Sequence, residues 1–278
     1  MGALAFVVLV SSTSAGCTAS GGTTAKAAHD PGVAHVHGLG VDPADGMLYA
    51  ATHYGLFRLP ASGAAVRVAG RFQDTMGFTV AGPGDFLGSG HPDPKEQGLP
   101  PRLGLIESND RGETWKALSL AGETDFHALH AVAGSVYGWD SGSGRLMVSK
   151  DRRTWQTLST LGLLDFAVNP TNPQDILATT QQGLARSADG GRTFTSSGPL
   201  LAYLAWPAAA DLWAVNPDGA LSHSADAGRT WQPRGQLSGQ PQALAVVAGV
   251  VYAAVAGDGI YMSSDAGRTF DVRYRYQQ

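Results

Sequence analysis

Pairs of short apolar runs, each joined by a tight polar turn, recur along this chain. Four examples are residues 48–60, 176–189, 212–226 and 251–265. In each, apolar residues alternate with small or polar residues on both sides of a turn such as "NPDG" or "AGDG". Short runs that are rich in β-branched and aromatic residues and bounded by Gly, Asp and Asn predict antiparallel β-hairpins. After residue 16, no segment is apolar for long enough to cross a bilayer. The pattern therefore predicts an all-β protein.

A polar motif recurs between the predicted strands at regular spacing. It reads "SNDRGETW" at Ser108, "SADGGRTF" at Ser187, "SADAGRTW" at Ser224 and "SSDAGRTF" at Ser263, with a shortened copy, "SKDRRTW", at Ser149. Adjacent serines are 41, 38, 37 and 39 residues apart. A period near 40 residues with short strands is typical of a β-propeller, with one blade per repeat. We expect the aspartate to accept backbone N–H bonds in a tight turn and the glycine to adopt positive φ. The motif is therefore predicted to be structural.

The motif S-x-D-x-G-x-T-W/F resembles the Asp-box, or BNR repeat, of sialidases and related propellers. The resemblance covers roughly residues 33–278, and the pattern "HVHGLGVDP" at 35–43 resembles a group of bacterial secreted Asp-box proteins labelled glycosylhydrolases. Membership of that group implies a propeller fold. It implies little about a reaction, because Asp-boxes also occur in proteins without glycosidase activity.

We predict a β-propeller of six four-stranded antiparallel blades, with the first strand of each blade innermost. The first blade has lost its motif, which has decayed to "PASGAA" at 60–65. Seven blades are less favoured because a seventh would need about 40 more residues. The predicted blades span 33–71, 74–120, 125–159, 163–197, 200–234 and 240–278.

Histidines gather at one predicted end of the first three blades. Alignment of the innermost strands places His37, Met76 and His127 at one equivalent position, and the second strands of the first two blades end at His53 and His91. The start of strand 1 and the end of strand 2 lie on the same face of an up-and-down blade. These five side chains are therefore predicted to surround one mouth of the central channel, opposite the motif turns.

Three functions are compatible with this ring. Imidazole and thioether ligands favour copper or zinc, so the leading hypothesis is a metal ion or small ligand bound at the mouth, and this hypothesis leaves open whether the protein is an enzyme. Nearby aspartates would accept hydrogen bonds from the imidazoles and so orient them around the metal ion. In the second hypothesis, a sialidase-like, glycan-directed hydrolase, the same aspartates would act as acid and base. These residues are Asp74, Asp125, Asp140 and Asp165. The third hypothesis is a scaffold for assembly of a membrane or envelope complex, with the proline-rich segment 90–104 as a protein contact or lid. A polar channel lining that satisfies water and backbone groups is the plainer alternative.

The N-terminal segment resembles a bacterial lipoprotein signal. Residues 1–16 contain an apolar core followed by small residues, and Cys17, the only cysteine, would carry the lipid. The segment departs from the pattern at Ser14, where leucine is usual, and no Lys or Arg precedes the apolar core. Residues 17–32 are small, polar and turn-rich, which predicts a flexible tether. The resemblance implies an extracytoplasmic protein anchored by lipid to the bacterial cell membrane.

Charge and cysteine content narrow the range of partners. The formal net charge is -4, and no basic tract suggests a nucleic-acid partner. One cysteine cannot form an internal disulfide, so we expect packing alone to hold the fold.

Overall fold

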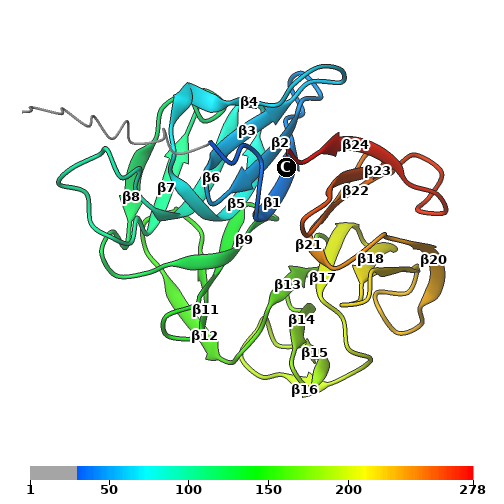
Figure 1. Ribbon diagram of the computed structural model, residues 1–278. Coiled ribbons are helices and arrows are strands. Elements are labelled where there is room, and N and C mark those ends of the chain that lie inside the picture. The colour runs from blue at the N-terminus through cyan, green and yellow to red at the C-terminus, as the bar shows by residue number, and fades with distance from the viewer. Residues whose placement is uncertain (1–29, 278) are drawn as a thin grey trace, which may run out of the picture. The chain divides into compact units, whose positions relative to one another are not determined.

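The computed structural model describes residues 30–277 and contains a compact unit, Pro31–Gln278, that is a six-bladed β-propeller (Figure 1). The predicted signal segment 1–16, Cys17 and most of the predicted tether 17–32 lie outside the described residues. No helix in the described part of the chain has the length and apolar character needed to span a bilayer. The prediction of six four-stranded blades is confirmed.

Each blade is one antiparallel sheet made from four strands that are consecutive in the sequence. The first two sheets are β1 Val36–Val41, β2 Leu48–Thr52, β3 Gly55–Leu59 and β4 Val66–Arg67, then β5 Asp74–Gly82, β6 Asp85–His91, β7 Leu105–Ser108 and β8 Lys116–Ser119. The next two are β9 Phe126–Val132, β10 Ser135–Asp140, β11 Arg145–Ser149 and β12 Gln156–Thr160, then β13 Asp165–Val168, β14 Ile176–Thr180, β15 Gly183–Ser187 and β16 Thr195–Ser196. The last two are β17 Tyr203–Ala208, β18 Asp211–Val215, β19 Ala220–Ser224 and β20 Gln232–Gln236, then β21 Pro241–Val247, β22 Val250–Val255, β23 Gly259–Ser263 and β24 Asp271–Arg275. A short 3-10 helix, Val68–Gly70, follows β4.

The core is divided into six apolar clusters, one between each pair of neighbouring blades. Between the first two blades, for example, Tyr49 and Phe86 pack edge to face with ring centroids 4.8 Å apart. Alternating strand residues point to opposite faces of a blade, so each blade contributes side chains to two clusters. Burial between blades therefore determines how the sheets stack around the axis.

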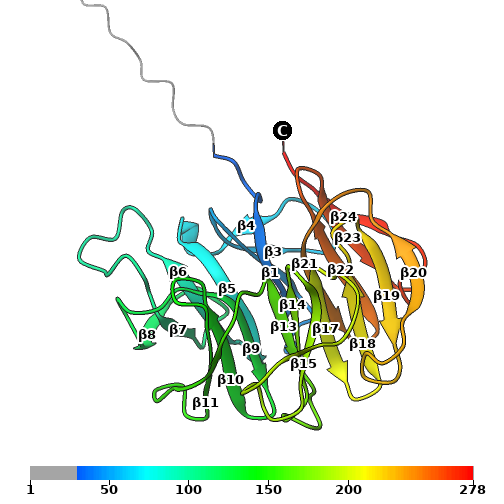
Figure 2. The ribbon, with the colours of Figure 1, turned by 90° about the horizontal axis from the view of Figure 1, so that it is seen from below.

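The ring closes by side-chain packing between the last and first blades. Ala254 and Ile260 share a cluster with Leu48 and Phe57, and the Arg273 guanidinium donates to the Leu59 carbonyl oxygen at 2.6 Å. No sheet in the described residues combines strands from both ends of the chain. Figure 2 shows that the chain enters β1 and leaves β24 at the same face of the propeller.

The repeated motif forms the Ser–Asp turns, which begin at Ser108, Ser149, Ser187, Ser224 and Ser263. In the turn at Ser224, the Ser224 hydroxyl donates to Asp226 at 2.8 Å and accepts the Gly228 N–H at 2.7 Å. The Asp226 carboxylate also accepts the backbone N–H and the hydroxyl of Thr230 at 2.8 and 2.6 Å. Gly228 adopts φ +80°, a conformation that favours glycine. These contacts support the predicted structural role of the aspartates.

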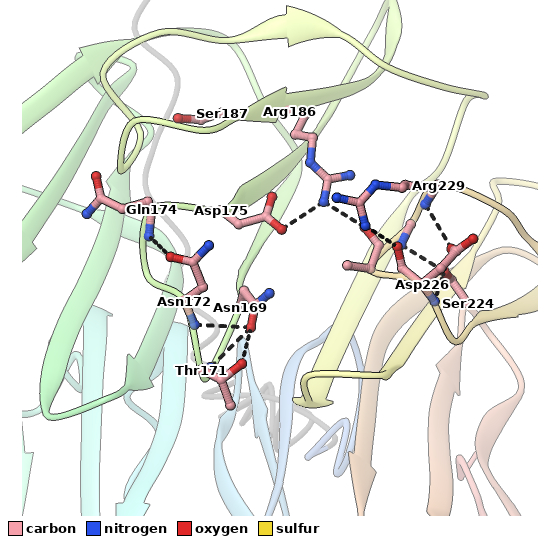
Figure 3. Close-up of polar contacts among 12 residues, drawn as sticks. Asn169, Thr171, Asn172, Gln174, Asp175, Arg186, Ser187, Ser224, Asp226 and Arg229 are labelled. Carbon is pink, nitrogen blue, oxygen red and sulfur yellow. Dashed lines mark hydrogen bonds and ion pairs between the residues drawn. The ribbon is translucent and has the colours of Figure 1, made fainter.

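The Ser–Asp turns also connect neighbouring blades. The Arg186 guanidinium pairs with Asp175 at 2.7 Å in its own blade and donates to the Ala227 carbonyl at 2.8 Å in the next blade's turn (Figure 3). These turns follow the third strand of their blades, so they lie on the face opposite the start of the innermost strands.

Stability is expected to fall as the pH drops below about 4, the usual carboxylate range. Hydrogen bonds from the Thr230 hydroxyl, the Thr230 N–H and the Ser224 hydroxyl lower the pKa of Asp226, and equivalent bonds lower that of Asp189 and Asp265. A carboxyl group with a depressed folded-state pKa contributes stability that is present above its unfolded pKa and lost as the pH falls through its folded pKa. Urea denaturation at pH 7, 4 and 3 should show this loss, with a shallower pH slope in Asp226→Asn. An unchanged slope in the variant would contradict the role given to Asp226.

Candidate functional site

The innermost strands β1, β5, β9, β13, β17 and β21 surround the centre of the propeller (Figure 1). A channel cavity of about 450 Å³ is lined by residues of these strands. Much of its wall is apolar, with Leu39, Phe78 and Val246 among the lining residues. His37 and His127 line the cavity near the start of β1 and β9. The channel wall thus combines many apolar residues with histidines at one mouth.

Four of the six innermost strands contain a β-bulge at an equivalent point. The register against the second strand shifts at His37 in β1, Met76 in β5, His127 in β9 and Gln242 in β21. A bulge inserts an unpaired residue and redirects its side chain, and bulges are common beside functional sites. The register therefore places His37, Met76 and His127 at equivalent positions, as the alignment predicts.

Gln242 belongs to the same set but was not among the predicted site residues. Its side-chain oxygen accepts the backbone N–H of Val36 at 3.3 Å, across the junction of the last and first blades. The sequence signal was available, because "QALAV" at 242–246 aligns with the other innermost strands.

The first histidine group at the mouth consists of His37, His53 and Asp74. The His53 Nδ1 atom lies 2.8 Å from Asp74 Oδ1, and His37 Nε2 lies 4.0 Å from the same oxygen. One potential ligand atom from each residue lies within 4.8 Å of the other two. The His37 and His53 rings meet edge to face with centroids 4.4 Å apart, and His35 lies against His53 at 5.2 Å. Two adjacent blades thus bring two imidazoles and a carboxylate together.

His37 is held in its neutral form. Burial, followed by the neighbouring His53, His127 and His35, lowers the pKa of His37 to about 3, and Asp125 opposes the shift. The Nε2 atom of His37 is buried, and no hydrogen-bond partner for it occurs among the described residues. A neutral imidazole nitrogen with a free lone pair is the form that binds a metal ion.

The second histidine group consists of His91, His127 and Asp125. The Nε2 atoms of His127 and His91 lie 3.0 and 3.5 Å from Asp125 Oδ2. The other oxygen of Asp125, Oδ1, is buried and lacks a hydrogen-bond partner within residues 30–277. On its far side, His91 Nδ1 lies 2.6 Å from the Pro101 carbonyl oxygen in the loop after β6.

The other two predicted aspartates lie in different surroundings. Asp140 is fully buried; its Oδ1 accepts the Asp125 N–H at 3.0 Å, and its Oδ2 lies 3.6 Å from Arg145. This arrangement fixes the backbone that carries Asp125. Asp165 lies along the channel, where Oδ1 is 3.3 Å from His130 Nε2 and Oδ2 accepts the Leu204 N–H at 2.9 Å.

Tyr203 is a further channel residue, and no sequence pattern singles it out. It lines the cavity, and burial together with the charge of Asp165 raises the pKa of Tyr203 to about 12. Its phenol therefore remains neutral at physiological pH. The channel lining combines this group with the His130–Asp165 pair.

The mouth provides the ligand types that borderline transition metals bind. Two imidazole nitrogens and one carboxylate oxygen suit zinc, copper, nickel or iron, and a set of three protein ligands leaves a coordination position open. Met76 occupies the bulge between those of His37 and His127, and a thioether would favour copper.

No family model matches this chain, and no curated protein matches it at a significant level. Solved structures with a similar fold include a chain of a nidogen/laminin complex, with 13% identity and a TM-score of 0.61 over 82% of this chain and 95% of that one. The GH74 enzyme of Niastella koreensis shares 14% identity with a TM-score of 0.58, over 88% of this chain and 46% of the enzyme. YCF48 from Cyanidioschyzon merolae shares 14% identity with a TM-score of 0.51, over 85% of this chain and 84% of that one.

These comparisons support the β-propeller fold, because identities near 14% carry information on the fold alone. The present chain spans less than half the length of the GH74 enzyme that it matches. The chemistry of the mouth must therefore be argued from its own residues.

Proposed function

We propose that this chain is a lipid-anchored, extracytoplasmic β-propeller that binds a transition-metal ion, copper or zinc, at the mouth of its channel. The ligands are His37, His53 and Asp74. The observation that carries the proposal is the approach of their ligand atoms to within 4.8 Å of one another. The lipid anchor and location follow from the signal-like segment at residues 1–17.

The distances in this group suit a four-coordinate ion after small movements. Ligand bonds of about 2.0 to 2.2 Å in a tetrahedron separate neighbouring ligand atoms by roughly 3.3 Å. The observed separations from Asp74 Oδ1 are 2.8 Å to His53 and 4.0 Å to His37, on either side of that value. A metal ion would replace the proton now shared between His53 and Asp74 and would provide His37 Nε2 with a partner.

Two other functions remain as alternatives. A glycan-directed hydrolase agrees with the fold shared with a GH74 enzyme, and it would use aspartates of the mouth as acid and base. However, Asp74, Asp125 and Asp165 each lie against a histidine, an arrangement that supports metal binding better than paired carboxylate chemistry. A scaffold for a membrane or envelope complex agrees with the exposed loop after β6 and with the fold similarity to a chain of a nidogen/laminin complex.

Metal content measured by elemental mass spectrometry tests the proposal. After dialysis against copper or zinc, the purified full chain is expected to retain metal, and the double variant His37→Ala/His53→Ala is expected to lose one equivalent. His223→Ala is the matched control, because His223 makes a similar contact with Asp211 at 3.0 Å near the opposite face. If the wild-type chain binds neither metal, the proposal is wrong, and glycan binding and partner capture become the next tests.

A further inference from the structure

The contact between His53 and Asp74 is repeated one blade further around the ring. His53 follows the second strand of the first blade, and Asp74 begins the innermost strand of the second blade. His91 ends the second strand of the second blade, and Asp125 directly precedes the innermost strand of the third. The Nδ1–oxygen distance is 2.8 Å in the first pair, and the Nε2–oxygen distance is 3.5 Å in the second. The fold therefore places a second histidine–aspartate pair at the next blade junction.

A bulge histidine completes each pair. His37 lies beside the first pair, and His127 lies 3.0 Å from the carboxylate of the second. Both are bulge residues of innermost strands, and both line the channel cavity. Each junction therefore presents two imidazoles and one carboxylate, but within the described residues only the first group has all three ligand atoms within 4.8 Å of one another.

The hydrogen bond on the far side of His91 identifies the nitrogen that faces the aspartate as an acceptor. The Pro101 carbonyl oxygen can only accept, so His91 Nδ1, 2.6 Å away, must donate its proton to it. In the neutral ring, Nε2 then carries a lone pair and faces Asp125 Oδ2 at 3.5 Å. A lone pair and a carboxylate oxygen that face each other repel, and a cation between them or an added proton would remove the repulsion.

Asp125 has unused capacity to bind such a cation. Its Oδ1 atom is buried and has no partner among the described residues, and Oδ2 is approached by two imidazole nitrogens. Desolvating a carboxylate oxygen without a partner is costly, and a bound metal ion would offset that cost. A histidine that binds a metal through one ring nitrogen usually donates its other N–H to a carbonyl or carboxylate oxygen, as His91 Nδ1 donates to the Pro101 carbonyl.

We propose that His91, His127 and Asp125 form a second site for a divalent transition-metal ion, adjacent to the first. This inference rests on the proposed function of the His37–His53–Asp74 site. The second site is more open, because the His91 side chain is 42% exposed and the His37 side chain is 20% exposed. Movement of the exposed His91 ring would bring its Nε2 atom into bonding distance, so metal at this site is expected to exchange faster.

Zinc stoichiometry tests this inference. The full chain, dialysed against Zn²⁺, is expected to hold two equivalents, and His91→Gln/His127→Gln is expected to hold one. Asp125→Asn is a second variant with the same expected loss, since it removes charge while keeping the size of the buried side chain. His223→Ala is again the matched control and is expected to retain two equivalents. Circular dichroism confirms that each variant is folded before its bound zinc is measured.

The outcomes separate this inference from the proposed function. One equivalent in the wild type that is lost only in the His37→Ala/His53→Ala variant would overturn the second site and leave the first. Two equivalents that persist in His91→Gln/His127→Gln would also overturn it. Failure of the wild type to bind zinc or copper would overturn both proposals.

Discussion

Replacement of Gly90 by alanine is expected to lower the free energy of unfolding by about 4 kcal/mol and to abolish metal binding at the channel mouth. Gly90 is buried at the end of β6 and adopts φ +132°, a conformation that L side chains rarely take. A Cβ atom there would lie 2.1 Å from the Asp74 carbonyl oxygen and 2.9 Å from the Met76 nitrogen. Backbone atoms cannot move aside as a flexible side chain would. The cost of the unfavourable φ at residue 90 therefore adds to the cost of the steric overlap.

The substitution affects the site because Gly90 lies between its elements. Asp74 pairs with His91, and Thr75 pairs with Gly90, in the β5–β6 ladder. Separation of these strands would displace the Asp74 carboxylate from His53 and the His91 ring from Asp125. Both histidine groups would lose their geometry through one change that removes no ligand.

Gly134→Ala provides the matched control. Gly134 also has positive φ, +74°, but its added Cβ atom would meet no atom within 4 Å. We expect a cost of about 1 kcal/mol and unchanged metal content. Urea denaturation and elemental analysis of both variants give the comparison. Equal stability losses in the two variants would show that the contact with Asp74 is unimportant.

The sequence is sufficient to predict the propeller because its information is local and repeated. Each Ser–Asp turn contains its own hydrogen-bonding partners within seven or so residues, as at Ser224 and Asp226, so the motif can be interpreted without knowing the rest of the fold. The period then determines the number of blades. The equivalence of His37, Met76 and His127 also follows from alignment, because their strands occupy the same position in consecutive repeats.

The partners of these residues could not be predicted from the repeat. Pairing of His53 with Asp74 and of His91 with Asp125 depends on how closely neighbouring blades approach, which is determined by packing between sheets. Asp140 is adjacent to the ring in the sequence alignment, yet its carboxylate accepts from the Asp125 N–H and the Ser143 hydroxyl and lies near Arg145. A bulge is likewise a property of the paired strands and is not encoded by one residue type.

Replacement of Phe126 by alanine is expected to lower the free energy of unfolding by about 4 kcal/mol. Phe126 is fully buried between the second and third blades, and its ring lies 4.9 Å from that of Trp155 between centroids. Its backbone lies between Asp125 and His127, so the cavity also loosens the second histidine group. Phe194→Ala, in which a half-buried ring is removed from a Ser–Asp turn, is the control and is expected to cost about 2 kcal/mol, since less apolar surface is lost.

A double-mutant cycle with Gly138 identifies the packing responsible. An alanine Cβ atom at Gly138 would lie 2.6 Å from the Phe126 ring, so Gly138→Ala alone is expected to cost about 2 kcal/mol by overpacking. In the Phe126→Ala background that methyl group has room and fills part of the cavity. The double variant should therefore be at least as stable as Phe126→Ala alone, with a coupling energy of about 2 kcal/mol. If the two losses of unfolding free energy simply add when measured by urea denaturation, contact with the Phe126 ring is not the reason that glycine occupies position 138.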